Sequence, residues 1–159
     1  MIPHIMTPVS RRITAQSLLL VLLAGAISVA PVAAFQSDPA AVAKLKSIAE
    51  AQHEIVLLLM KKQEYEQALT EANKIFDMKW PSDQEPLLLK ELLNLADQLL
   101  NQGQAQAGIR FIERNSKHFK KTSSQAAILK EMGYLYKSLK QDDKAFEYFR
   151  KARDMEGGK

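Results

Sequence analysis

The sequence predicts an all-α fold built from paired helices. Its 159 residues include only six glycines and six prolines, while Leu, Ala, Lys, Glu and Gln, which favour helices, are common. Apolar residues recur at helical spacing in segments that short turns separate. The hydrophobic fraction of 47% and the charged fraction of 25% are typical of a globular chain of about one domain.

Charge and cysteine content exclude several classes of function. The net charge of +4 falls to +2 when Arg11 and Arg12 are left out, which is too small to indicate nucleic-acid binding. The chain has no cysteine, so it has no disulfide, no thiolate metal site, no cysteine nucleophile and no lipidated cysteine. This composition does not fix the compartment, because a helical domain of this size can be stable without disulfides.

The sequence also argues against catalysis. It contains no G-x-S-x-G motif, no P-loop and no H-E-x-x-H motif. Beyond the leader, His53 and His118 are the only histidines, and neither has an acidic or histidine partner at ligand spacing. We therefore expect a protein that is not an enzyme and that uses no metal and no other cofactor.

Residues 1–34 have the pattern of a secretory signal peptide. Arg11 and Arg12 form a positive region, and an apolar run follows over residues 18–29. Small residues then precede a cleavage site after Ala34. This pattern predicts a periplasmic or secreted protein, most naturally bacterial.

Two alternatives to a cleaved general secretory signal remain for this leader. The uncharged stretch 13–37 is long enough to cross a bilayer of about 30 Å, so an uncleaved N-terminal anchor is the second reading. A twin-arginine signal is disfavoured, because Thr14 and Ala15 stand where larger apolar residues are required. In every case the rest of the chain would lie outside the cytoplasm, with membrane contact only through the leader.

The first helical pair is predicted from Pro39 onward. Asp38 can cap this helix, and proline suits the first helical position because no amide donor is needed there. Residues 55–60, IVLLLM, are apolar nearly all round, so we expect this half to be covered on more than one side. A short turn at 61–63 then leads to a second helix over 65–76.

An interruption at residues 77–83 separates the first pair from the next. Trp80-Pro81 must leave the helix, Ser82 or Asp83 can cap the following helix, and Pro86 is tolerated in its first turn. Trp80 is either an exposed binding anchor or a cover for the seam between two helical pairs, and we favour the seam.

Two further pairs are predicted downstream. The second pair ends at Asn115, where we expect either loose packing or a local cap made by this side chain. A polar, basic loop follows up to Ser124. In the third pair, Asp142 is placed to cap the second helix.

Small and large apolar residues follow a fixed order in the last two pairs. The third pair contains Leu129, Met132, Gly133, Tyr136, Ala145, Phe149 and Ala152, and the second contains Leu92, Leu95, Ala96, Leu99, Gly103 and Gly108. This order resembles the tetratricopeptide repeat, whose unit of about 34 residues carries W-x-x-L-G-x-x-Y and then A-x-x-x-F-x-x-A.

The resemblance covers residues 49–159. It implies a right-handed α-α superhelix of about three hairpins, at about 49–82, 89–122 and 126–159, with 35–48 as an N-terminal helical extension. Gly133 and Ala145 lack bulk and would let the two helices of a unit approach closely. The copy in residues 49–82 is degenerate, because Gln52 and Val56 occupy two signature positions.

In this family the first helices of the hairpins line a concave groove. The corresponding positions here are apolar in the middle of the groove and charged at its edges, which suits an amphipathic helix or an extended peptide. They are Glu50, His53, Leu57, Met60, Lys90, Leu93, Asp97, Leu100, Lys130, Tyr134 and Lys137. The alternative is that the apolar members are core residues.

Some members of the family clamp a terminal carboxylate with lysine and asparagine. Of the corresponding positions in this chain only Asn94 matches. The others hold His53, Leu57, Ala127 and Glu131. Binding of a chaperone tail is therefore not expected.

Two other surfaces are candidates for contacts. One is a basic stretch that is either a solvated face or a site for a polyanion; it comprises Arg110, Arg114, Lys117, His118, Lys120 and Lys121. The other is the last helix, where no further helix is expected to cover Phe146 and Tyr148, so that self-association could occur there.

These patterns predict an exported, non-catalytic scaffold or adaptor that binds a peptide or helix of another protein in its concave groove. The alternative is a structural envelope protein that self-assembles through its last repeat. The leader and the nearly neutral body disfavour helical repeats that bind RNA.

Overall fold

The computed structural model describes residues 38–158, and this part of the chain is entirely α-helical apart from turns and two short 3-10 segments. It lies within a compact unit, Phe35–Lys159, that is distinct from Met1–Ala34. The predicted signal peptide at 1–34 lies outside the described residues. No strand occurs among those residues, so the prediction of an all-α fold is confirmed.

Six α-helices follow one another along residues 38–158. They are α1 (Pro39–Lys61), α2 (Tyr65–Phe76), α3 (Glu85–Asn101), α4 (Ala105–Asn115), α5 (Thr122–Ser138) and α6 (Asp142–Glu156). The 3-10 segments are Ser82–Gln84 before α3 and Ser116–His118 after α4.

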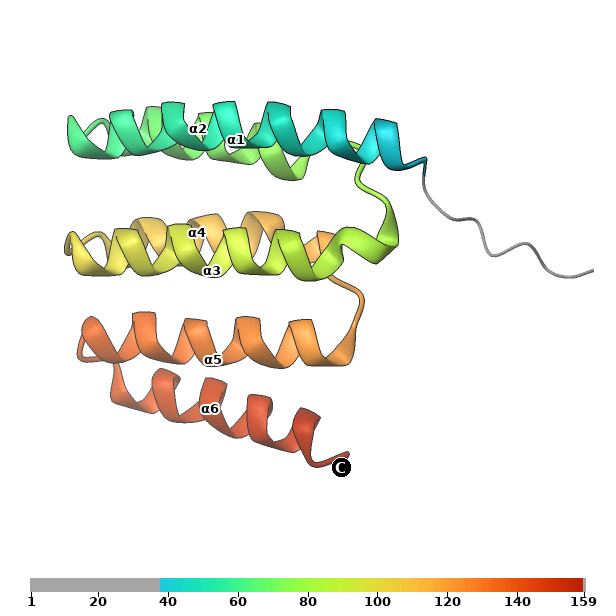
Figure 1. Ribbon diagram of the computed structural model, residues 1–159. Helices are drawn as coiled ribbons and strands as arrows, with labels where there is room; N and C mark the ends of the chain where they lie inside the picture. The colour runs from blue at the N-terminus through green and yellow to red at the C-terminus, as the bar shows by residue number, and fades with distance from the viewer. Residues whose placement is uncertain (1–37, 159) are drawn as a thin grey trace, which may run out of the picture. The chain divides into compact units, whose positions relative to one another are not determined.

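The helices pack as three consecutive pairs, α1 with α2, α3 with α4 and α5 with α6. Between pairs, α4 contacts both α2 and α5, and α3 contacts α5. The first helices α1, α3 and α5 therefore lie along one face, and α2 and α4 lie behind it (Figure 1).

The turns inside the three pairs have the same geometry. Each contains one residue with positive φ: Gln63 at 64°, Gly103 at 74° and Lys140 at 58°. The amide of each of these residues donates to the carbonyl three residues earlier, and the next amide donates to the carbonyl five residues earlier. This is the Schellman arrangement that satisfies carbonyls at a helix end. Only one of the three positions is a glycine, the residue that adopts positive φ without strain.

The core lies where the middle pair meets its neighbours. More than half of α4 is buried, and Phe111 from this helix meets Phe76 of α2 edge-on with ring centroids 5.5 Å apart. Phe119 also packs on Phe76, with ring centroids 6.4 Å apart. The stretch 116–124, predicted to be a polar loop, thus places a buried aromatic ring in the core.

Gly133 marks the closest approach within the last pair. A Cβ atom at this position would lie 2.6 Å from the Phe149 ring on α6. A side chain at Gly108 would similarly meet Leu135 of the next pair at 2.9 Å. The small residues therefore stand where helices touch, as the sequence pattern indicates.

The second half of α1 corrects one prediction. Val56 and Met60 are buried, but Ile55 is 44% exposed and Leu58 is 58% exposed. Residues 55–60 are therefore covered on one side, because the outer side of α1 has no neighbour among the described residues.

Of the three helix N-caps predicted from the sequence, one is confirmed. Asp38 caps α1 by accepting a hydrogen bond from the Ala40 amide at 3.0 Å, and Pro39 occupies the first position, as predicted. The predicted cap of α3 by Ser82 or Asp83 is wrong, because both belong to the 3-10 segment and Gln84 is the N-cap. Asp142 does not cap α6 either, because the N-cap is Gln141 and Asp142 stands in the first turn.

We expect Lys140→Gly to raise the free energy of unfolding by about 1 kcal/mol, because glycine removes the cost of a left-handed backbone at a non-glycine residue. Gly103→Ala, at the equivalent turn, should lower it by about the same amount. Urea denaturation measures both. A loss of stability in Lys140→Gly would contradict the assignment of its backbone conformation.

We expect Gly133→Leu to lower the free energy of unfolding by about 1–3 kcal/mol, because the new side chain would overlap the Phe149 ring. The loss should shrink in a Phe149→Ala background, where space exists for the added carbons. An equal loss in both backgrounds, measured by urea denaturation, would show that Gly133 does not face Phe149.

Candidate functional site

The face formed by α1, α3 and α5 carries two pockets. The α1–α3 pocket lies between α1 and α3 and also includes Ile75 of α2 and Trp80, which follows α2. The α3–α5 pocket lies between the third and fifth helices. On α3, the exposed residues Leu87, Lys90, Asn94 and Asp97 recur at helical spacing, and Leu87 lines the first of these pockets while Asp97 lines the second.

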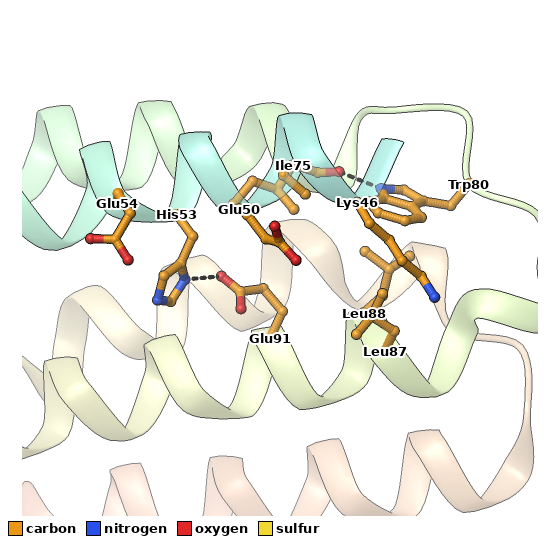
Figure 2. Close-up of a pocket in the computed structure, with 10 residues that line it drawn as sticks. Lys46, Glu50, His53, Glu54, Ile75, Trp80, Leu87, Leu88 and Glu91 are labelled. Carbon is orange, nitrogen blue, oxygen red and sulfur yellow. Dashed lines mark hydrogen bonds and ion pairs between the residues drawn. The ribbon is translucent and has the colours of Figure 1, made fainter. Parts of the chain in front are cut away.

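The α1–α3 pocket has a volume of about 270 Å³ and combines apolar and charged side chains (Figure 2). Its apolar part includes Ile75 and Leu88, which are buried, and Trp80, which is partly buried. The remaining lining residues are Lys46, Ala49, Glu50, His53, Glu54, Leu87 and Glu91.

His53 and Glu91 join the two sides of this pocket. The Nδ1 atom of His53 on α1 lies 2.6 Å from Oε1 of Glu91 on α3, and both side chains are partly buried. The partner that the sequence did not reveal for His53 therefore comes from another helix, 38 residues further along the chain. Helical spacing around His53 carries no signal for such a contact.

Trp80 is fixed against the end of α2. Its indole Nε1–H donates a hydrogen bond of 2.7 Å to the carbonyl oxygen of Ile75, which stands in the last turn of the helix, where carbonyls lack helical partners. The ring consequently packs at the seam between the first two pairs, the reading that we favour, and it also lines the α1–α3 pocket (Figure 2).

The α3–α5 pocket is wider and shallower, with a volume of about 540 Å³. Tyr134 is 52% exposed here, and its ring meets Phe149 edge-on at a centroid distance of 5.1 Å. The other lining residues are Asp97, Leu100, Lys137 and Ser138. The structure thus brings together four residues that the sequence places in the groove.

The remaining predicted groove residues do not share one environment. Leu57 and Leu93 are partly buried, Lys90 is exposed, and Lys130 donates to Glu156 of α6 at 2.6 Å. Met60 is 2% exposed and belongs to the core. Its assignment to an open groove is therefore wrong.

A pair of acids lies between α3 and α5. Glu131 is 7% exposed, and its Oε1 atom has no hydrogen-bond partner in the described part of the chain. Burial, together with the charge of Asp97 and a hydrogen bond between the two carboxyl groups, raises the pKa of Glu131 to about 7. Glu131 therefore carries a proton for much of the time near neutral pH, a property that sequence spacing does not indicate.

Acids of α2 and of its C-cap lie against the basic stretch. Arg110 pairs with Glu66, while Arg114 and His118 lie 3.6 Å and 3.7 Å from Asp77. Burial, reinforced by the charge of Lys117, lowers the pKa of His118 below its usual value. These pairs link the first two helical pairs, so much of the predicted basic surface has a structural explanation.

Asn115 also links these two pairs. It is fully buried, and its Nδ2 atom donates to Asn73 Oδ1 at 2.8 Å and to the Phe111 carbonyl at 2.9 Å. The side chain therefore replaces the small residue of the repeat pattern with an amide that bonds within α4 and also reaches α2.

Within residues 38–158, no group of three or more acidic or histidine residues is arranged to hold a metal ion. None of the helices in that range is both long and apolar enough to cross a bilayer.

Comparison of the chain with protein-family models, curated proteins and solved structures found no match. The class of this protein therefore follows from the geometry of residues 38–158, which form three helical pairs with two pockets on the α1–α3–α5 face.

The raised pKa of Glu131 predicts a specific pH dependence of stability. Because the folded state holds this proton more tightly than the unfolded state, the stabilisation is complete below about pH 4.5 and is lost as the pH rises through about 7. We expect Glu131→Gln to exceed the native chain in stability by about 1–3 kcal/mol at pH 8 and to differ little at pH 4.5. Urea denaturation at both pH values provides the measurement, with Glu113→Gln at an exposed position of α4 as the control. A difference that does not change with pH would disprove the assignment.

Proposed function

We propose that this chain is an exported, non-catalytic interaction protein whose α1–α3–α5 face binds a helix or an extended segment of another protein. The observation that carries the proposal is the presence of two pockets along this face, with the half-exposed ring of Tyr134 held in one of them. Amphipathic helices and extended peptides commonly bind in grooves that offer apolar anchors at regular intervals.

We further propose that the helical pairs form a right-handed superhelix of the tetratricopeptide type. Two features support this finer description. The three hairpin turns share one geometry, at Gln63, Gly103 and Lys140, and Gly133 stands directly against Phe149 within one pair. In such stacks each pair covers the apolar side of the next, and the first helices line the concave surface.

The mixed character of the face suits a polypeptide ligand. Tyr134 and Leu100 offer apolar surface in the α3–α5 pocket, while Asp97 and Lys137 place opposite charges beside them. A partner with an apolar anchor flanked by both charges would bury the aromatic ring and pair with the charges around it.

We propose no catalytic role for the acid pair Asp97 and Glu131. Glu131 is almost fully buried between two helices and does not line the α3–α5 pocket, so it is poorly placed to reach a bound substrate. We interpret the pair as a structural contact that lowers the free energy of unfolding above neutral pH, where Glu131 loses its proton.

Export is part of the proposal and rests on residues 1–34, with the charged pair, the apolar run and the small residues before position 35. The proposed location is the periplasm or the extracellular space, and an uncleaved N-terminal anchor is the alternative.

A second candidate function is self-assembly through the last helix. Phe146 on α6 is 69% exposed, the largest exposure among the large apolar residues that the structure describes. Self-association would bury this ring, which would otherwise remain in water. Sedimentation that shows a monomer at high protein concentration would exclude this candidate.

The interaction proposal is tested at Tyr134. We expect Tyr134→Glu in the full-length protein to reduce recovery of its envelope partner at least tenfold, because a charge would replace the apolar anchor. Gln106→Glu, an equally exposed change on α4 behind the face, is the matched control and should leave recovery unchanged. Affinity capture followed by quantitative mass spectrometry provides the measurement. Equal recovery with both variants would exclude the α3–α5 pocket as the contact.

A further inference from the structure

The α1–α3 pocket has a surplus of negative charge beside an aromatic ring. Three carboxylates line it, from Glu50, Glu54 and Glu91, against one lysine, Lys46, and one histidine, His53. With histidine neutral, the formal charge of these residues is negative, and it stays negative when the ring is protonated.

Two of these carboxylates lack a cationic partner. Glu91 is bound to His53 at 2.6 Å, whereas neither Glu50 nor Glu54 forms an ion pair with any residue that the structure describes. In Figure 2 the Glu50 carboxylate points into the space between α1 and α3, beside the His53–Glu91 pair. A cation that entered this space would meet a carboxylate that is free to bind it.

The apolar part of the pocket offers a complementary surface. Trp80, Leu87 and Leu88 lie at the end of the pocket away from His53 (Figure 2). The hydrogen bond from the Trp80 indole to the Ile75 carbonyl holds the ring in place. A fixed indole can attract a cation over its face, and leucine side chains can pack against an aliphatic stem.

We propose that the α1–α3 pocket binds one arginine or lysine side chain of the segment that the face captures, an inference that rests on the proposed function. The cationic head would contact Glu50 and the outer edge of Glu91, and the aliphatic stem would lie along Trp80 and Leu88. The volume of about 270 Å³ is slightly below the range of about 300–1,000 Å³ typical of small-molecule sites, and suits a single long side chain.

The charges disfavour an anionic ligand. An anion would approach Glu50, Glu54 and Glu91 at short range, where like charges repel. Lys46 is the one lysine at the pocket, and it competes with an incoming cation for the same carboxylates. The two residues Glu50 and Lys46 should therefore affect binding in opposite directions.

Trp80 provides the readout, because it is the only tryptophan in the sequence. Its fluorescence is recorded while the full-length protein is titrated at low salt with N-acetyl-arginine amide, which carries the side chain on a peptide-like backbone. The isosteric uncharged probe is N-acetyl-citrulline amide, and the anionic probe is N-acetyl-glutamate amide. The monocation n-propylguanidine, which has the arginine side chain without the backbone amides, represents a free small cation.

We expect a saturable fluorescence change with the arginine probe and affinity at least tenfold lower for the citrulline and glutamate probes. Glu50→Gln should weaken arginine binding about tenfold, as loss of a charged partner does, while Lys46→Gln should strengthen it several-fold. Both residues are exposed, so the variants should fold normally, which circular dichroism checks.

Equal affinity for the arginine and citrulline probes would overturn the inference, and so would an unchanged affinity in Glu50→Gln. Tighter binding of n-propylguanidine than of the arginine probe would also overturn it, because the pocket would then be assigned to a free cation. The titration is repeated in Tyr134→Glu, which should bind the arginine probe normally. If the α1–α3–α5 face proves not to bind a partner, the arginine titration still tests the α1–α3 pocket. If neither protein binds the arginine probe, the inference about this pocket is wrong, whatever the result of the partner capture.

Discussion

The structure depends on one constraint: each helical pair has an apolar side that only the neighbouring pair can cover. The middle pair has a neighbouring pair on both sides, so more than half of the residues of α4 are buried. The ring of Phe111 fills the space against α2, and Gly108 allows α5 to approach. Burial of this apolar surface against both neighbours provides the main stabilisation of the stack.

The same constraint produces the open face of α1, α3 and α5. Helix α4 makes much of the contact between pairs, and on the opposite face the first helices α1, α3 and α5 border open spaces. The pockets form in these spaces, and their lining residues come from helices that are distant in sequence. Long-range polar contacts such as His53 with Glu91, and Asn115 with Asn73, then fix the pairs against one another.

The hairpin turns show how one backbone geometry is produced by different residues. Gly103 adopts positive φ without strain, but Gln63 and Lys140 adopt it at a cost. Packing of the helices on both sides of each turn requires the same reversal of the chain, and this requirement overrides the local preference of a glutamine or a lysine.

Much of the fold could be predicted from the sequence, since helical periodicity gives the number and pairing of the helices. Far less of the site could be predicted. Tyr134, Leu100, Asp97 and Lys137 were placed in a groove by the repeat pattern and do line one pocket, but Met60 was misassigned because the pattern does not tell which side of α1 faces α2. The roles of Glu91 and Glu131 depend on partners in other helices, and no local signal marks them.

The sequence by itself determined the local features of this protein. Asp38 and Pro39 start α1, Pro81 separates the first pair from the second, and small residues stand where helices touch, because backbone geometry and side-chain size act over a few residues. Only the tertiary structure decided that Trp80 bonds to the Ile75 carbonyl and that His53 contacts Glu91. It also decided that Phe119, which stands in a polar segment of the sequence, is buried in the core. Those contacts arise when helices pack, and the packing of distant segments is set by the whole chain.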